Sequence, residues 1–65
     1  MKNSIKQLRA EHRYSQAELA LMVGVSRQAI NAVETGKHDP SLLLAFNIAK
    51  TFSLSIEDVF DPKAR

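Results

Sequence analysis

The segment from Gln16 to Val33 constrains the fold of this chain more than any other part of its sequence. A capping-box pattern, Ser15 with Glu18, marks its start. In this pattern the serine and glutamate side chains satisfy free backbone N–H groups at the beginning of a helix. Gly24 ends the first helix, because glycine adopts the left-handed conformation of a helix end without steric cost. Only Val25 separates Gly24 from a second cap, Ser26. The pattern predicts two short helices joined by a tight turn.

Small and apolar side chains indicate how these two helices pack. Ala20 must be small, because the second helix of the pair crosses the first closely at that point. Val25, Ile30 and Val33 then fill the angle between the helices. This is the helix-turn-helix arrangement, in which the second helix presents its N-terminal residues to the major groove of DNA. An ordinary helical hairpin within a small bundle is the alternative.

Three further helices are expected around this pair, which gives an all-α fold of five helices. The expected ranges are about Ser4 to Arg13, a second helix opening at Ser15, about Arg27 to Glu34, a fourth helix capped by Ser41 that runs to about Phe52, and a short fifth helix from Ser55 to near Phe60. The expected inner stripe of the fourth helix is Leu42, Ala45, Ile48, Ala49 and Phe52. We expect one domain over residues 1–65, with a core of about 4–60 and a tail of 61–65.

Composition excludes several classes of protein. The 65 residues contain no cysteine, which excludes disulfides, thiolate zinc sites and a cysteine nucleophile. No stretch approaches the roughly 20 apolar residues that a membrane span needs, and the N-terminus lacks the apolar run of a signal peptide. A cytoplasmic protein, associated with the nucleoid when bound to DNA, is the expectation.

Charge is distributed unevenly along the chain, although the formal net charge is only +2. Residues 1–37 contain six Lys or Arg against three acids, whereas residues 54–61 contain three acids and no base. This distribution indicates that one end of the molecule faces phosphates while the other faces something else.

Five blocks of sequence together resemble the Cro/phage-repressor, or XRE, family. They are Ser15 to Ala20, Val23 to Gln28, Ile30 and Asn31, Glu34 to Lys37, and Asp39 to Leu42, and the resemblance extends over about Ile5 to Phe60. It implies a lambda-repressor-like domain with its helix-turn-helix at the second and third helices. Within the family the chain is most similar to the short stand-alone bacterial repressors, so we expect a homodimer on a palindromic operator in double-stranded DNA.

Four polar residues on the leading face of the third helix are the candidates for reading bases: Ser26, Arg27, Gln28 and Asn31. Gln and Asn pair in bidentate fashion with adenine, and Arg pairs with guanine. Gln28 and Asn31 are the preferred base readers. Arg27 reaches either a base or a phosphate with its long side chain.

Five residues are candidates for contacts with the DNA backbone. Gln16 resembles the family's phosphate clamp, which combines its amide with free N–H groups at a helix start. Lys37 and His38 follow the third helix, where a second phosphate would pass. Ser41 either donates its hydroxyl to DNA or only caps its helix, and capping is preferred. Arg13 either reaches the backbone or is simply solvated.

The resemblance implies a structural role for Arg9 and Glu34. At the matching positions of the family an ion pair ties the first helix to the end of the third. We therefore expect Arg9 to stabilise the fold rather than to contact DNA.

Apolar residues outside the expected core favour a dimer. Ile56, Val59 and Phe60 fall on one face of a helix that is expected to be too short to bury all three. Leu43 lies off the core face of the fourth helix, at a position where the family usually has a polar residue. These four residues are the candidate dimer interface.

Catalysis is not expected. His12 and His38 lie far apart in the sequence, and neither has a ligand partner at helical spacing, so no metal, cofactor or catalytic group is expected. One alternative remains open, an antitoxin-like module whose main partner is a toxin protein. A regulator of restriction-modification genes is another version of the repressor hypothesis, and the sequence does not separate the two.

Overall fold

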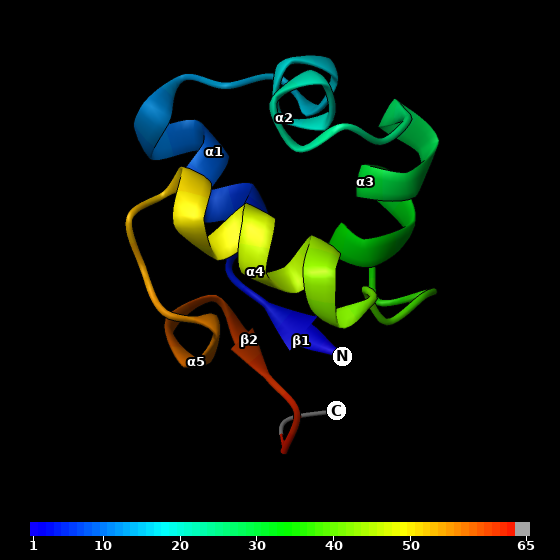
Figure 1. The fold of residues 1–65 in the computed structure, drawn as a ribbon, viewed down its shortest axis with the longest axis vertical. Helices are drawn as coiled ribbons and strands as arrows, with labels where there is room; N and C mark the ends of the chain where they lie inside the picture. The colour runs from blue at the N-terminus through cyan, green and yellow to red at the C-terminus, as the bar shows by residue number, and fades with distance from the viewer. Residues whose placement is uncertain (64–65) are drawn as a thin grey trace.

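The computed structural model describes residues 1–63, and in this part of the chain five helices surround one apolar core (Figure 1). The elements are β1 (Lys2–Asn3), α1 (Ile5–His12), α2 (Gln16–Val23), α3 (Arg27–Glu34), α4 (Leu42–Thr51), α5 (Ile56–Val59) and β2 (Phe60–Asp61). The expected five-helix fold with a helix-turn-helix at α2 and α3 is confirmed. Ala64 and Arg65, which belong to the expected tail, lie outside the described residues.

Serine caps begin four of the helices, as the sequence predicts. The hydroxyls of Ser15, Ser26, Ser41 and Ser55 accept hydrogen bonds from backbone N–H groups three residues further on, at 2.9, 3.1, 3.1 and 3.3 Å. At Ser15 the capping box is complete, because the Glu18 carboxylate accepts from the Ser15 N–H at 2.8 Å. That contact lowers the pKa of Glu18. The box therefore stabilises α2 above the ordinary pKa of a glutamate and weakens as the pH falls.

The first helix is shorter at both ends than the sequence suggests. Ser4 makes no side-chain cap, and the side-chain oxygen of Asn3 instead accepts from the Ile5 N–H at 3.1 Å. At the other end, Arg13 adopts a left-handed conformation with a φ of 58° and stops the helix after His12. Such a conformation is uncommon for a residue with a Cβ, so composition alone does not reveal it.

The core is built from every helix and from β2. Its fully buried large side chains are Ile5, Leu19, Ile30, Ile48 and Val59. Ala20 is 3 % exposed at the crossing of α2 and α3, and Val33 closes the same angle. The alanine is the small contact residue that close packing of two helices requires.

The prediction that Leu42 of α4 belongs to the core is wrong. Leu42 is 71 % exposed, because the apolar core of residues 1–63 extends along α4 only as far as Leu44, which is partly buried against it. The remaining members of the predicted stripe, Ala45, Ile48, Ala49 and Phe52, are buried.

The expectation that α5 leaves its apolar side chains for a partner is also wrong. Val59 and Phe60 are 2 % and 3 % exposed within this chain's own core, and Ile56 packs partly buried against it. The reason is an antiparallel pairing of β1 with β2, in which Asn3 lies opposite Phe60, together with a 2.9 Å bond from the Ser4 N–H to the Val59 carbonyl. These bonds hold the segment after α5 against the start of α1 (Figure 1).

One buried and one exposed side chain test this description of the core. Phe60→Ala should lower the free energy of unfolding by about 3–5 kcal/mol, the usual cost of removing a buried aromatic ring. Leu21→Ala, at a site where the side chain is 85 % exposed, should change it by less than about 1 kcal/mol. Urea denaturation followed by circular dichroism measures both. Equal losses for the two variants would contradict the assigned core.

Candidate nucleic-acid interface

The outer face of α3 presents a row of polar side chains. Arg27, Gln28 and Asn31 are exposed, while Ile30 and Val33 on the opposite face are buried in the core. The helix is therefore held by one face and offers the other to solvent. Ser26, also expected to read a base, uses its hydroxyl to cap the helix at Ala29.

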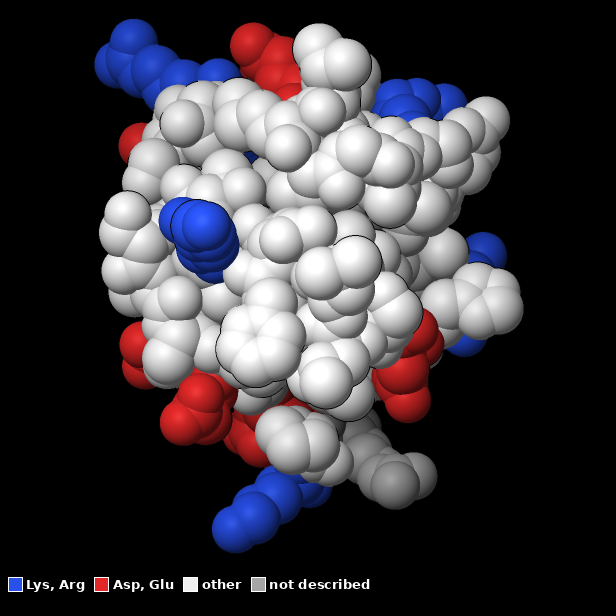
Figure 2. Space-filling model, viewed as in Figure 1, with Lys and Arg blue, Asp and Glu red and all other residues white. Residues whose placement is uncertain are grey.

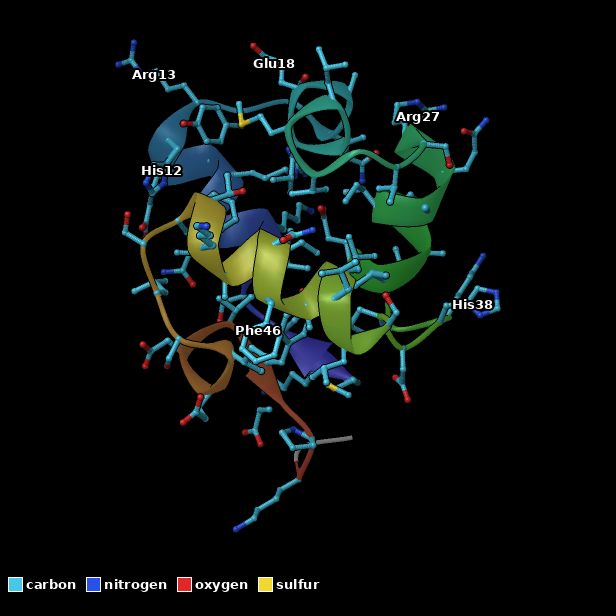
Figure 3. All side chains as sticks on the ribbon, in the orientation of Figure 1. His12, Arg13, Glu18, Arg27, His38 and Phe46 are labelled. Carbon is cyan, nitrogen blue, oxygen red and sulfur yellow. The ribbon has the colours of Figure 1, made fainter. Side chains whose placement is uncertain are left out.

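The loop after α3 has a defined backbone conformation. Gly36 adopts a φ of +79°, and its N–H donates to the Val33 carbonyl at 3.1 Å. The N–H groups of Lys37 and His38 both donate to the Ala32 carbonyl, at 2.9 and 3.2 Å. Their exposed side chains thus leave a fixed turn directly beyond the end of α3, and Figure 3 shows His38 on the same side of the molecule as Arg27.

Gln16 is partly buried at the start of α2 and reaches across to α3. Its Nε2 donates to Asn31 Oδ1 at 3.1 Å and, at 3.5 Å, to Glu34 Oε1. Gln16, the expected phosphate clamp, and Asn31, an expected base reader, are therefore in direct contact. This contact was not predicted from the sequence.

The two remaining phosphate candidates have different surroundings. Ser41 caps α4 through the Leu44 N–H, which is the preferred role. Arg13 is exposed at the end of α1, and Figure 3 places it on the opposite side of the molecule from His38. The structure therefore does not bring Arg13 together with the loop after α3.

Arg9 and Glu34 form the ion pair that the resemblance implies. Two hydrogen bonds join them, from Arg9 Nε to Glu34 Oε2 at 2.9 Å and from Arg9 Nη2 to Glu34 Oε1 at 2.8 Å. Arg9 Nη1 also donates to the Tyr14 carbonyl at 3.0 Å. The two side chains are only 15 % and 7 % exposed, and the hydrogen bonds with Glu34 raise the pKa of Arg9 despite the opposing effect of burial. The pair connects α1, the loop before α2, and the end of α3.

Charges around this face are unevenly placed. Figure 2 shows acidic groups gathered near the end of the molecule where α5 lies, with a basic side chain extending beyond them, whereas the opposite end carries basic groups on either side of an acidic one. Among residues 1–63, no three His, Asp or Glu side chains are grouped so that they could hold a metal ion. Within the same residues, no helix combines the length and apolar character of a membrane span.

Comparison with known proteins places this geometry in a family. The helix-turn-helix family model matches residues 5–59, which is most of the chain. The chain belongs to this helix-turn-helix family. It is 58 % identical over 60 residues to an HTH-type transcriptional regulator of Methanocaldococcus jannaschii, and the match covers 92 % of this chain and 91 % of that protein.

Two solved helix-turn-helix structures share the fold. The DNA-binding domain of SinR from Bacillus subtilis superposes with a TM-score of 0.79 at 29 % identity, covering 94 % of this chain and 90 % of that one. The restriction-modification controller protein C.AhdI from Aeromonas hydrophila superposes with a TM-score of 0.78 at 27 % identity, covering 86 % and 85 %.

Asn3 supports the helix-turn-helix unit and was missed in the sequence. Its Nδ2 donates to the Val33 carbonyl at 3.0 Å and to the Glu34 carbonyl at 3.5 Å, in the last turn of α3. Carbonyls at the end of a helix lack partners within the helix, so this side chain supplies one. An asparagine before the first apolar residue of α1 signals a helix start, but it does not signal a contact with a helix thirty residues away.

The Arg9–Glu34 pair gives a direct test. Arg9→Ala should cost a few kcal/mol of stability, because it leaves the Glu34 carboxylate buried without its partner. DNA binding should be lost in parallel with folding. Thermal melting and DNA affinity measured on the same sample check this. Near-wild-type melting combined with lost binding would contradict the structural role.

Proposed function

We propose that this helix-turn-helix protein is a sequence-specific transcriptional repressor that binds a palindromic operator in double-stranded DNA as a homodimer. It would act on DNA in the cytoplasm. The observation that carries the proposal is the exposed row of Arg27, Gln28 and Asn31 on a helix whose other face is buried. A helix fixed in this way presents its polar side chains to the major groove in a constant register.

The neighbouring groups fit contacts with the DNA backbone. Lys37 and His38 leave the fixed turn at the end of α3 and supply donors beside the reading helix. Gln16 lies at the start of α2, where backbone N–H groups have no partner within the helix. Such groups hold phosphates and set the register of a protein on the duplex, while base contacts supply the sequence preference.

An apolar patch on α4 supports the homodimer. Leu42, Leu43 and Phe46 lie at helical spacing and are 71 %, 70 % and 55 % exposed. Phe46 is labelled in Figure 3 on the face turned toward the viewer, and Figure 2 shows that the centre of this face has little charge. We call these three residues the α4 patch. The α4 patch takes the place of Val59 and Phe60 as the candidate dimer surface. It includes Leu43, which the sequence analysis also assigned to the interface.

A second copy of the chain fits the α4 patch. If two α4 helices pair antiparallel across a twofold axis near Leu44, the exposed Lys50 at one end approaches Asp39 of the other copy. Each protomer measures 28 × 22 × 20 Å. Two reading helices separated by about 34 Å, one turn of duplex, therefore suit two protomers in contact.

Selection from random duplex DNA tests the proposed function. The purified protein should enrich one palindromic sequence whose half-sites are one helical turn apart. The experiment gives the base preference and the half-site spacing together. No enrichment of any sequence at moderate ionic strength would overturn the proposal.

Gln28→Ala tests the reading helix. Loss of its amide should relax the preference at one base pair in each half-site and cost about 1–3 kcal/mol for the preferred base. Affinity for unrelated duplex DNA should stay unchanged. Fluorescence anisotropy with the selected site and its single-base variants measures both quantities, and an unaltered base profile would rule out this role.

Lys37→Ala tests the phosphate contact. Binding to all sequences should weaken, and the slope of log affinity against log salt concentration should become shallower by about 1 per protomer. The base profile should not change. Titrations at several salt concentrations measure the slope. Unchanged non-specific affinity at low salt would show that Lys37 touches no phosphate.

Leu43→Glu tests the α4 patch. A carboxylate in the centre of a twofold contact faces its own copy, so the variant should sediment as a monomer and lose most of its operator affinity. Leu21→Glu is the matched control, because Leu21 is 85 % exposed on α2, outside the patch. Sedimentation equilibrium measures both variants. Equal behaviour of the two would exclude the patch as the interface.

A further inference from the structure

A continuous set of hydrogen bonds links the buried ion pair to the exposed surface of α3. Arg9 donates to Glu34 Oε1 at 2.8 Å, and Gln16 Nε2 approaches the same oxygen at 3.5 Å. Gln16 Nε2 also donates to Asn31 Oδ1 at 3.1 Å. Three helices therefore contribute to one connected network that ends at Asn31.

The two charged groups fix the direction of every bond in this network. A guanidinium only donates hydrogen bonds, and an ionised carboxylate only accepts them. Glu34 is 7 % exposed and held by Arg9, so only the amino end of the Gln16 amide can face it. The same amino group then requires an acceptor on Asn31, which is Oδ1. The Glu34 carboxylate therefore sets the orientation of the Asn31 amide, through its contact with Gln16.

The orientation of the Asn31 amide decides which hydrogen-bonding group this surface offers to DNA. With Asn31 Oδ1 turned toward α2, its Nδ2 is the group left for DNA, and within residues 1–63 no acceptor is bonded to it. Adenine presents one acceptor and one donor in the major groove, so its bidentate pairing with asparagine needs both amide atoms. Guanine presents two acceptors, N7 and O6, along the same edge.

We infer that Asn31 reads a base edge that carries two acceptors, that of guanine, and that Gln16 sets this preference by holding the Asn31 oxygen. This differs from the sequence prediction that Asn31 pairs with adenine. The inference rests on the proposed function, since it concerns which base the reading helix selects. Gln16 is in this respect a positioning residue. Both hydrogens of its Nε2 are engaged in the network, so a phosphate at this place would be held by the free backbone N–H groups at the start of α2.

Base profiles of four proteins test the inference. The base pair read by Asn31 is the one whose preference disappears in Asn31→Ala, and the wild-type protein should prefer a G·C pair there by about tenfold over an A·T pair. In Gln16→Leu the released Asn31 amide can turn both atoms to the base, so that preference should fall to about twofold or reverse toward adenine. Gln7→Leu is the matched control, because Gln7 is exposed on α1 away from this network, and its profile should equal that of the wild type.

The readout is the ratio of affinities for two bases at one position, so a uniform loss of affinity in Gln16→Leu does not affect it. A preference for an A·T pair at the position read by Asn31, or an unchanged ratio in Gln16→Leu, would overturn the inference while leaving the proposed function intact. Absence of any base preference in the wild-type protein would instead overturn the proposed function.

A measurement without DNA tests the network itself. In NMR spectra of the free protein, the side-chain amide protons of Gln16 should exchange with water at least several times more slowly than those of Asn31. The Gln28 amide provides the exposed reference, because among residues 1–63 its side chain has no hydrogen-bond partner. Faster exchange at Gln16 than at Asn31 would reverse the assigned direction of the bonds and overturn the inference.

Discussion

The contact between Arg9 and Glu34 supports most of the structure that surrounds the reading helix. It joins α1 to the end of α3, and through the Tyr14 carbonyl it also fixes the loop that leads into α2. Because both side chains are largely withdrawn from water, neither is tolerated without the other. The same carboxylate orients Gln16 and so connects the interior of the domain with its DNA-facing surface. A single buried charge pair thus serves both the fold and the proposed recognition.

Features encoded by neighbouring residues were predictable from the sequence. The caps at Ser15, Ser26, Ser41 and Ser55 depend on residues three positions apart, and all four helices begin where those serines predict. The turn at Gly24 is similarly local, since a left-handed residue must follow α2. The exposed face of α3 followed from the buried positions of Ile30 and Val33, which leave the remaining positions to solvent.

Features that depend on distant residues were missed or wrong. Asn3 stabilises the end of α3 across thirty positions, and no local pattern signals such a bond. The strands β1 and β2 are two residues each, too short to show an alternation of apolar and polar residues. Because the sequence does not reveal this pairing, it predicts a partner for the apolar residues near α5, whereas the chain itself buries Val59 and Phe60. The contact between Gln16 and Asn31 was missed for the same reason, since it also joins distant residues.

The joining of β1 to β2 also affects how the protein reaches its working form during synthesis. Val59 and Phe60, which complete the core, are translated after the other buried residues of this domain, and they pack beside β1, which leaves the ribosome before them. A chain that lacks this segment exposes the core and leaves β1 and Asn3 without their anchor. The domain therefore reaches its folded form only after β2 has been made.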